Sequence, residues 1–120
     1  MNNKGFTLIE LLVVIAIVGV LMGLVIAVIN PATILYRSRQ GVCKANVART
    51  CEAVIACYTA MNDVTKCDDK DKVGVTLPTS PCSVTITSGT GVVSGTQDSC
   101  TFTCTPAGGM QTPTGTCYAK

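Results

Sequence analysis

The sequence contains no histidine, although it contains eight cysteines. The base that usually activates a catalytic cysteine is therefore missing, which argues against a cysteine-based enzyme. No two cysteines form a C-x2-C pair, the spacing typical of structural zinc sites. Nucleophile–base pairs and phosphate-binding loops are also missing from the pattern. We therefore expect no catalytic site, no metal and no cofactor.

Aromatic residues and net charge are scarce as well. The five aromatic side chains are too far apart in the sequence to propose electron conduction: Phe6, Tyr36, Tyr58, Phe102 and Tyr118. The formal net charge of +2 is too small to indicate nucleic acid or an acidic surface as a partner. The length predicts one small domain on a stalk.

A long apolar run is the most informative feature that is present. Leu11–Ile29 contains nineteen consecutive residues without a charge, long enough to cross a bilayer. Glu10 stands at its entrance, and an ionisable group in a membrane helix is costly enough to indicate a role. The run exceeds the 7–15 residues or so of a secretory signal peptide, and helical patterning continues beyond it.

The segment around this run reads GFTLIELLVVIAIVGVL. It resembles the class III signal of type IV prepilins and of the related pseudopilins. The resemblance covers residues 4–29 and implies that a prepilin peptidase cuts between Gly5 and Phe6. It also implies methylation of the new N-terminal amine at Phe6, and identifies Glu10 with the glutamate of the family's signal.

A plain N-terminal membrane anchor is the competing interpretation. Lys4 on the short side of the run predicts a cytoplasmic N-terminus and an exported C-terminal part in both cases. Glu10 separates the two, because an anchor gains nothing from a buried carboxylate. In a filament, Glu10 can meet the Phe6 amine of the next subunit. The pair would neutralise two charges and fix the register of neighbours.

Helix is predicted to continue well beyond the membrane segment, from about Phe6 to Met61. One buried face is indicated by apolar positions spaced three or four residues apart: Cys43, Val47, Cys51, Val54, Tyr58 and Met61. Four polar residues lie largely off this stripe, as solvent-facing positions would: Arg49, Glu52, Thr59 and Asn62. The pattern ends at Asn62-Asp63.

Pro31 interrupts the helical pattern, because proline removes one backbone hydrogen bond and clashes with the preceding turn. Gly19 and Gly23 lie upstream, so Gly19–Pro31 is the weakest stretch. The resemblance implies bending in the monomer and leaves open local melting in a filament.

Beyond the helix, residues 64–72 form a charged segment that we interpret as a solvated turn. Calcium is the alternative, since some pseudopilins bind it through aspartates, but the spacing does not match an EF-hand loop. Farther on, residues 83–87 and 101–103 alternate as half-buried strands do. Turns are predicted at residues 89–91, at Gly95 and at residues 107–109.

The expected fold class is therefore α+β. A long N-terminal helix packs against a small, disulfide-rich antiparallel β-sheet head, a layout that also matches the pilin family. We divide the chain into a leader (1–5), a transmembrane or filament-core helix (6–30), an amphipathic helix (31–62) and the β head (63–120).

In an exported head, the eight cysteines predict four disulfides: Cys43, Cys51, Cys57, Cys67, Cys82, Cys100, Cys104 and Cys117. On one helix, Cys43 and Cys51 are ~12 Å apart, and Cys51 and Cys57 ~9 Å. A disulfide needs Cα atoms within about 7 Å, so these three cannot pair with one another. Each must reach one of the other five, leaving one further pair. Type IV pilins often carry a disulfide-closed C-terminal loop, and this resemblance favours Cys104–Cys117 as that pair.

The resulting prediction is a structural subunit of a type IV pilus-like filament serving adhesion, motility or DNA uptake. A pseudopilin of a secretion system and a minor pilin are the alternatives. The implied partners are copies of the chain, the prepilin peptidase, and an assembly platform with its ATPase. We expect the chain to cross the inner (cytoplasmic) membrane once before assembly and to lie in the extracellular pilus afterwards. DNA is possible through Arg37, Arg39, Lys44 and Arg49, although contacts between subunits are the favoured interpretation of these residues.

Overall fold

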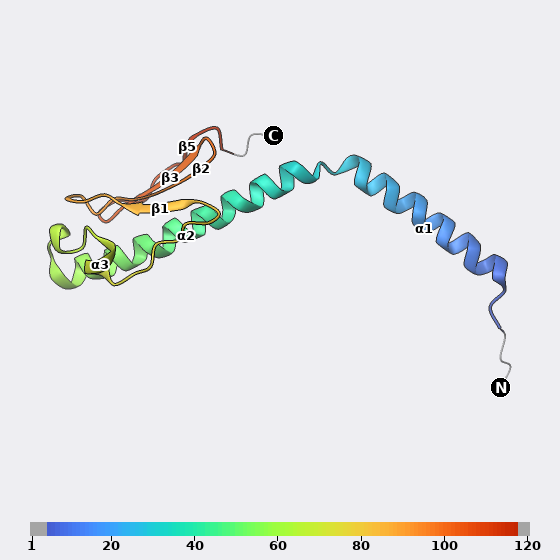
Figure 1. The fold of residues 1–120 in the computed structure, drawn as a ribbon, viewed down its shortest axis with the longest axis horizontal. Coiled ribbons are helices and arrows are strands. Elements are labelled where there is room, and N and C mark those ends of the chain that lie inside the picture. Colours follow the sequence, from blue (N-terminus) through green and yellow to red (C-terminus); the bar gives the residue numbers. More distant parts are fainter. Residues whose placement is uncertain (1–4, 118–120) are drawn as a thin grey trace. The chain divides into compact units, whose positions relative to one another are not determined.

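A computed structural model describes residues 5–117, and the chain forms two compact units, one up to Ile34 and one from Leu35 onward. Helix α1 spans Leu8–Val28 and helix α2 spans Pro31–Met61 (Figure 1). Two short helical turns follow, η1 (Val64–Lys66) and α3 (Lys70–Val73). The strands are β1 (Ser83–Ile86), β2 (Val93–Gln97), β3 (Cys100–Thr105), β4 (Gly109–Met110) and β5 (Thr114–Gly115).

Helix α1 is the apolar run of the sequence. Its 21 residues correspond to about 31 Å, close to the thickness of a bilayer core. None of its described residues is buried within the chain. By length and composition, α1 is able to cross a membrane. Its apolar surface therefore has to be covered by something outside this chain.

Two residues, Ile29 and Asn30, separate the end of helix α1 from the start of helix α2. Ile29 is extended (φ −87°, ψ 119°), and the Asn30 side chain accepts a hydrogen bond from Ala32 N–H at 3.1 Å. Asn30 therefore acts as an N-cap with Pro31 at the first helical position, where proline loses no hydrogen bond. Pro31 starts a helix instead of bending one, which corrects the expectation of a single continuous helix. Gly19 and Gly23 remain helical.

The head is an antiparallel sheet that lies along one side of α2 (Figure 1). Its strand order is β1-β2-β3, with β4 and β5 pairing with opposite ends of β3. The predicted strands at residues 83–87 and 101–103 are confirmed as β1 and β3. A two-residue turn at Asp98-Ser99 joins β2 to β3, and Asp98 takes the positive φ (52°) that such hairpins favour.

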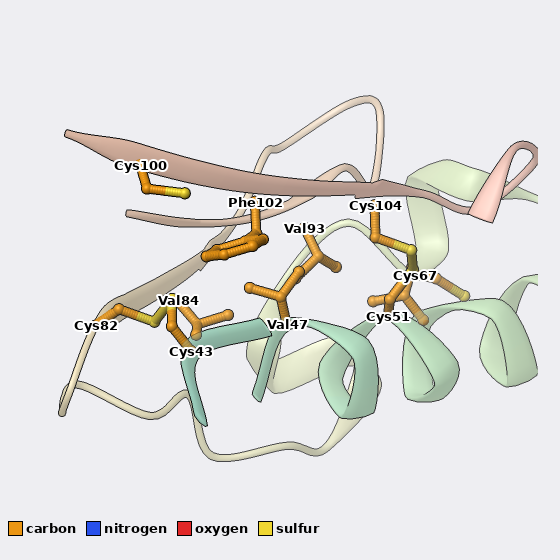
Figure 2. Packing of buried hydrophobic residues seen from close by; sticks show 11 residues of the cluster. Cys43, Val47, Cys51, Cys67, Cys82, Val84, Val93, Cys100, Phe102 and Cys104 are labelled. Atoms are coloured by element: carbon orange, nitrogen blue, oxygen red, sulfur yellow. A yellow bond between two sulfur atoms is a disulfide. The ribbon is translucent and has the colours of Figure 1, made fainter. Parts of the chain in front are cut away.

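The core lies between the inward face of the sheet and one face of α2. Figure 2 shows Phe102 and Val93 pointing from the sheet towards Val47 of α2. Six of the eleven buried hydrophobic residues are disulfide cysteines, and Phe102 is the one aromatic among them. A head this small buries little apolar surface, so cross-links make up for a limited core.

The predicted helix stripe is confirmed over most of its length. Cys43, Val47, Cys51 and Val54 are buried, whereas Tyr58 is half-buried. Met61 is 58 % exposed, so the prediction was wrong at the last turn of α2, which lies beyond the core. Polar Gln40 and Thr50 are buried on this face, which hydrophobic periodicity could not indicate.

Gly95 is not a turn residue, contrary to the prediction. It lies in the middle of β2 and is buried. A Cβ atom added there would lie 2.5 Å from Val47 Cγ2 and 3.3 Å from the Sγ atoms of Cys43 and Cys82. Glycine is needed here because the strand backbone approaches the helix side chains this closely.

Four disulfides link the head, and no described cysteine is free. Their Cα atoms lie 4.9–6.0 Å apart, in the pairs Cys43–Cys82, Cys51–Cys104, Cys57–Cys67 and Cys100–Cys117. The expectation that the three α2 cysteines do not pair with one another is confirmed. Only Cys51–Cys104 joins α2 directly to a strand, since Cys82 precedes β1 and Cys67 follows η1.

The expected Cys104–Cys117 pair is wrong. Cys104 lies on the inward face of β3 and is joined to Cys51 of α2, as Figure 2 shows. At the other end of β3, Cys100 pairs in register with Gly115 of β5. Because β5 pairs there, Cys117, two residues after Gly115, lies close enough to Cys100 to form the disulfide. The C-terminal loop is therefore closed, but four residues earlier than the resemblance implied.

Candidate functional site

The predicted processing site lies just before α1. Gly5, Phe6 and Thr7 are exposed and non-helical, and nothing lies within 4 Å of a Cβ added at Gly5. The peptide bond between Gly5 and Phe6 therefore lies at the start of an exposed, non-helical segment. Residues 1–4 of the predicted leader, including Lys4, fall outside the described part of the chain.

Thr7 and Glu10 form a capping box at the start of α1. The Glu10 Oε2 atom accepts hydrogen bonds from Thr7 N–H at 2.9 Å and from Thr7 Oγ1–H at 2.8 Å. In return, Thr7 Oγ1 accepts the Glu10 backbone N–H at 3.4 Å. The Thr-x-x-Glu spacing is a helix-start signal that our sequence interpretation did not use. Glu10 therefore has a role within one chain.

The capping box leaves part of Glu10 available. Its Oε1 atom accepts no hydrogen bond from residues 5–117, whereas Oε2 is held by Thr7. A shallow groove of about 410 Å³ surrounds the carboxylate and is otherwise apolar, lined by Phe6, Ile9, Val13 and Val14. Glu10 is exposed in the single chain, so its attraction for a cation becomes strong only where a bilayer or another molecule excludes water from this groove.

Residues 1–26 match the protein-family model of the prokaryotic N-terminal methylation motif. The chain carries a type IV prepilin signal. This signal confirms the resemblance on which the cleavage and methylation sites were assigned. It belongs to structural proteins, both type IV pilins and pseudopilins. No curated protein and no solved structure matches the chain.

The prepilin signal ends at residue 26, within α1, so the head has to be described from its own residues. The four basic residues considered for DNA are all exposed on α2. Arg37 and Lys44 are seven residues apart and share a helix face, but Arg39 and Arg49 fall on other faces. They do not form one strip.

Asp68 is a structural carboxylate that the sequence interpretation placed in a solvated turn. It is 5 % exposed, and its Oδ1 atom accepts a hydrogen bond from Lys72 Nζ at 2.6 Å. Its Oδ2 atom accepts Gly89 N–H at 2.6 Å and Ser88 Oγ–H at 3.2 Å. The bonds from Lys72 and Gly89 hold the pKa of Asp68 at about 2. Asp68 thus ties the segment after η1 to the β1–β2 loop.

The neighbouring acidic residues are also used within the chain. Asp63 caps η1, Asp69 caps α3, and Asp71 pairs with Lys70 at 2.7 Å. Among residues 5–117, no three His, Cys, Asp or Glu side chains gather as a metal site would require. These aspartates therefore serve as caps and ion-pair partners within the segment.

Proposed function

We propose that the chain is a structural subunit of a type IV pilus-like filament. It is cut after Gly5, methylated at Phe6 and assembled through α1, and the filament serves adhesion, motility or DNA uptake. One observation carries the proposal: a prepilin signal leads into a helix with no buried residue, while the other unit has a cross-linked core of its own.

The exposed apolar surface of α1 explains why the subunit needs a bilayer before assembly and other subunits after it. Leu, Ile and Val side chains cover the helix, and about 25 cal/mol is gained per Å² of apolar surface removed from water. A bilayer covers this surface before assembly, and the α1 helices of other copies cover it in the filament. The peptidase and the platform with its ATPase act at the transition between the two.

Glu10 sets the register of neighbouring subunits in this proposal. Cleavage gives Phe6 an ammonium group. The Oε1 atom of Glu10 in one copy accepts a hydrogen bond from the Phe6 ammonium group of the next copy. Thr7 keeps its hydrogen bonds to Oε2 at the same time. Removing one partner of such a buried ion pair costs about 3–5 kcal/mol.

Three variants separate this role from helix capping. Glu10→Gln keeps the capping box, because glutamine also serves at that position, but removes the charge. Thr7→Val removes the cap and keeps the charge. Glu10→Val removes the charge and the glutamate half of the capping box, while Thr7 Oγ1 can still accept the backbone N–H of residue 10. The proposal predicts few filaments from both Glu10 variants and near-normal filament yield from Thr7→Val, each with a stable membrane monomer.

The yield of sheared filaments, normalised to the membrane-bound subunit, is the measurement. Normal yield from Glu10→Gln together with loss in Thr7→Val would show that Glu10 acts only as a cap. A processed subunit that stays in short membrane-associated assemblies would instead favour a pseudopilin.

A further inference from the structure

A pocket lies at the C-terminal end of α2, within the unit that begins at Leu35. It has a volume of about 420 Å³ and is lined by Tyr58, Asn62, Asp63, Val64, Thr90, Thr105, Pro106 and Ala107. This volume falls within the range of about 300–1,000 Å³ that small-molecule sites occupy. None of these residues belongs to the prepilin signal or to a disulfide.

Four chain segments meet to form this pocket: the end of α2, the start of η1, the β1–β2 loop and the β3–β4 turn. Gly91, with a φ of +63°, lets the β1–β2 loop lie close to Val64 and Pro106. A Cβ atom there would lie 3.0 Å from Val64 Cγ2 and 3.2 Å from Pro106 Cγ. The Gly91 backbone therefore packs closely against the side chains of Val64 and Pro106, which holds three of the walls together.

Asn62 and Asp63 are fixed by the end of α2. Asn62 takes a left-handed conformation (φ 51°), as residues that terminate helices often do, and its N–H donates to Tyr58 O at 2.7 Å. The Asp63 Oδ1 atom accepts Thr65 N–H at 3.0 Å and Thr65 Oγ1–H at 2.7 Å. These bonds hold the pKa of Asp63 below its usual value, so the carboxylate is ionised.

Several polar groups of the pocket have unused hydrogen-bonding capacity. Within residues 5–117, the Tyr58 hydroxyl, the Asn62 side-chain amide and the Asp63 Oδ2 atom make no hydrogen bond. The hydroxyl groups of Thr90 and Thr105 bond only to nearby backbone groups. The pocket thus offers donors and acceptors together, beside an aromatic ring and the apolar side chains of Val64, Pro106 and Ala107.

The charges around the pocket narrow the class of ligand. Asp63 is the one ionised group among the lining residues, and no lysine or arginine lines the pocket. An anionic ligand would meet the Asp63 carboxylate, and Lys66, whose positive charge acts on Asp63, does not line the pocket. A simple ammonium group would use the carboxylate but make no hydrogen bond with the threonine hydroxyls or the Asn62 amide, which would stay hydrated.

We propose that this pocket binds one neutral pyranose ring of a saccharide. A pyranose has an apolar C–H face for the ring of Tyr58 and a rim of hydroxyl groups that donate and accept hydrogen bonds. These groups match Asn62, Asp63 and the two threonines. The inference goes beyond the filament role, because a single subunit carries the whole site.

The test uses the full-length chain in an amine-oxide detergent, which has no sugar head group. Saturation-transfer NMR measures binding of methyl glucoside, methyl galactoside and N-acetylglucosamine, with glucuronate and choline as charged probes. We expect the neutral pyranosides to bind with dissociation constants in the roughly millimolar range of small polar ligands. Glucuronate and choline are expected to bind more weakly.

Two matched pairs of variants locate the site. Tyr58→Ala removes the aromatic face and is expected to weaken binding by about tenfold, whereas Tyr58→Phe keeps the face and most of the affinity. Thr90→Val removes a pocket hydroxyl and is expected to weaken binding. Thr85→Val makes the same change on exposed β1 and is expected to leave binding unchanged.

Native disulfide pairing, checked by peptide mapping, together with an unchanged thermal unfolding midpoint for each variant shows that a loss of binding is not a loss of folding. The proposal is overturned if no neutral pyranoside binds the wild-type chain, if Tyr58→Ala binds as the wild type does, or if glucuronate or choline binds best. Filament formation is scored separately in cells, so either hypothesis can fail without the other.

Discussion

Val47 of α2 lies against Gly95 of β2, so close that no residue with a Cβ atom would fit at position 95 without a shift. A Cβ atom on Gly95 would be 2.5 Å from Val47 Cγ2. This approach lets the sheet lie near enough to α2 for Cys43 to reach Cys82 and for Cys51 to reach Cys104. A glycine in mid-strand therefore positions two of the four cross-links.

We predict that Gly95→Ala destabilises the head by about 1–3 kcal/mol, because the core has no room for the added methyl group. Denaturant unfolding of the detergent-solubilised chain measures the change. Gly41→Ala is the matched control: Gly41 is exposed in α2 with open space around it, so alanine there should stabilise by roughly 0.4–1 kcal/mol.

A double variant tests the Val47 contact itself. Val47→Ala relieves the clash, so Gly95→Ala and Val47→Ala together should be less destabilising than the sum of the two single changes. Strict additivity would contradict the contact.

The disulfides are expected to differ in their contributions. Cys51–Cys104 spans 53 residues and is buried, whereas Cys57–Cys67 spans 10. The loop-entropy relation gives the longer link about 1.5 kcal/mol more stabilisation. Replacing each pair by two alanines and comparing unfolding midpoints checks this order. A larger loss from removing Cys57–Cys67 would contradict it.

Asp68 makes the head sensitive to strong acid. Its pKa is about 2 in the folded chain, below its ordinary value of 3.8. A lowered pKa stabilises the folded state above the unfolded value, and this stabilisation is lost as the pH falls through the folded value. The head should therefore lose stability between about pH 4 and pH 2.

Asp68→Asn isolates that effect, because asparagine has a similar shape and can still accept a hydrogen bond but carries no negative charge to pair with Lys72. The variant should be less stable than the wild type at pH 7, and the difference between the two should shrink towards pH 2. Thermal melts across this range provide the measurement. A difference that does not change with pH would refute the role of the carboxylate charge.

The start of α2 depends on Asn30. Asn30→Ala removes the acceptor for Ala32 N–H, and the loss of an N-cap costs about 0.5–2 kcal/mol. Amide hydrogen exchange should accelerate at Ala32 and its helical neighbours, while exchange in the middle of α1 stays unchanged. Unchanged exchange at Ala32 would mean that Asn30 is not the cap.

The sequence predicted features that depend on local periodicity or on covalent limits. The apolar run became α1, the cysteine and valine stripe became the buried face of α2, and helix geometry excluded pairing among the α2 cysteines. The prepilin signal was identifiable because its residues are contiguous.

Long-range contacts account for most of what the sequence did not reveal. Gly95 resembles a turn residue until Val47 lies against it, and Asp68 resembles a solvated charge until Gly89 approaches. Cys100 and Cys104 lie on the same face of β3, so only the pairing of β5 decides which one takes Cys117. The capping box at Thr7 and the cap at Asn30 were readable from local sequence but were not interpreted as such.

Mass spectrometry of protein sheared from the cell surface, without reduction, tests the central claim most directly. The account predicts a chain that begins at methylated Phe6, is eight hydrogens lighter than its fully reduced form, and is abundant in long fibres. Peptide mapping should recover Cys51 joined to Cys104. A chain that still begins at Met1 and stays in the membrane would contradict the account and favour a plain membrane anchor.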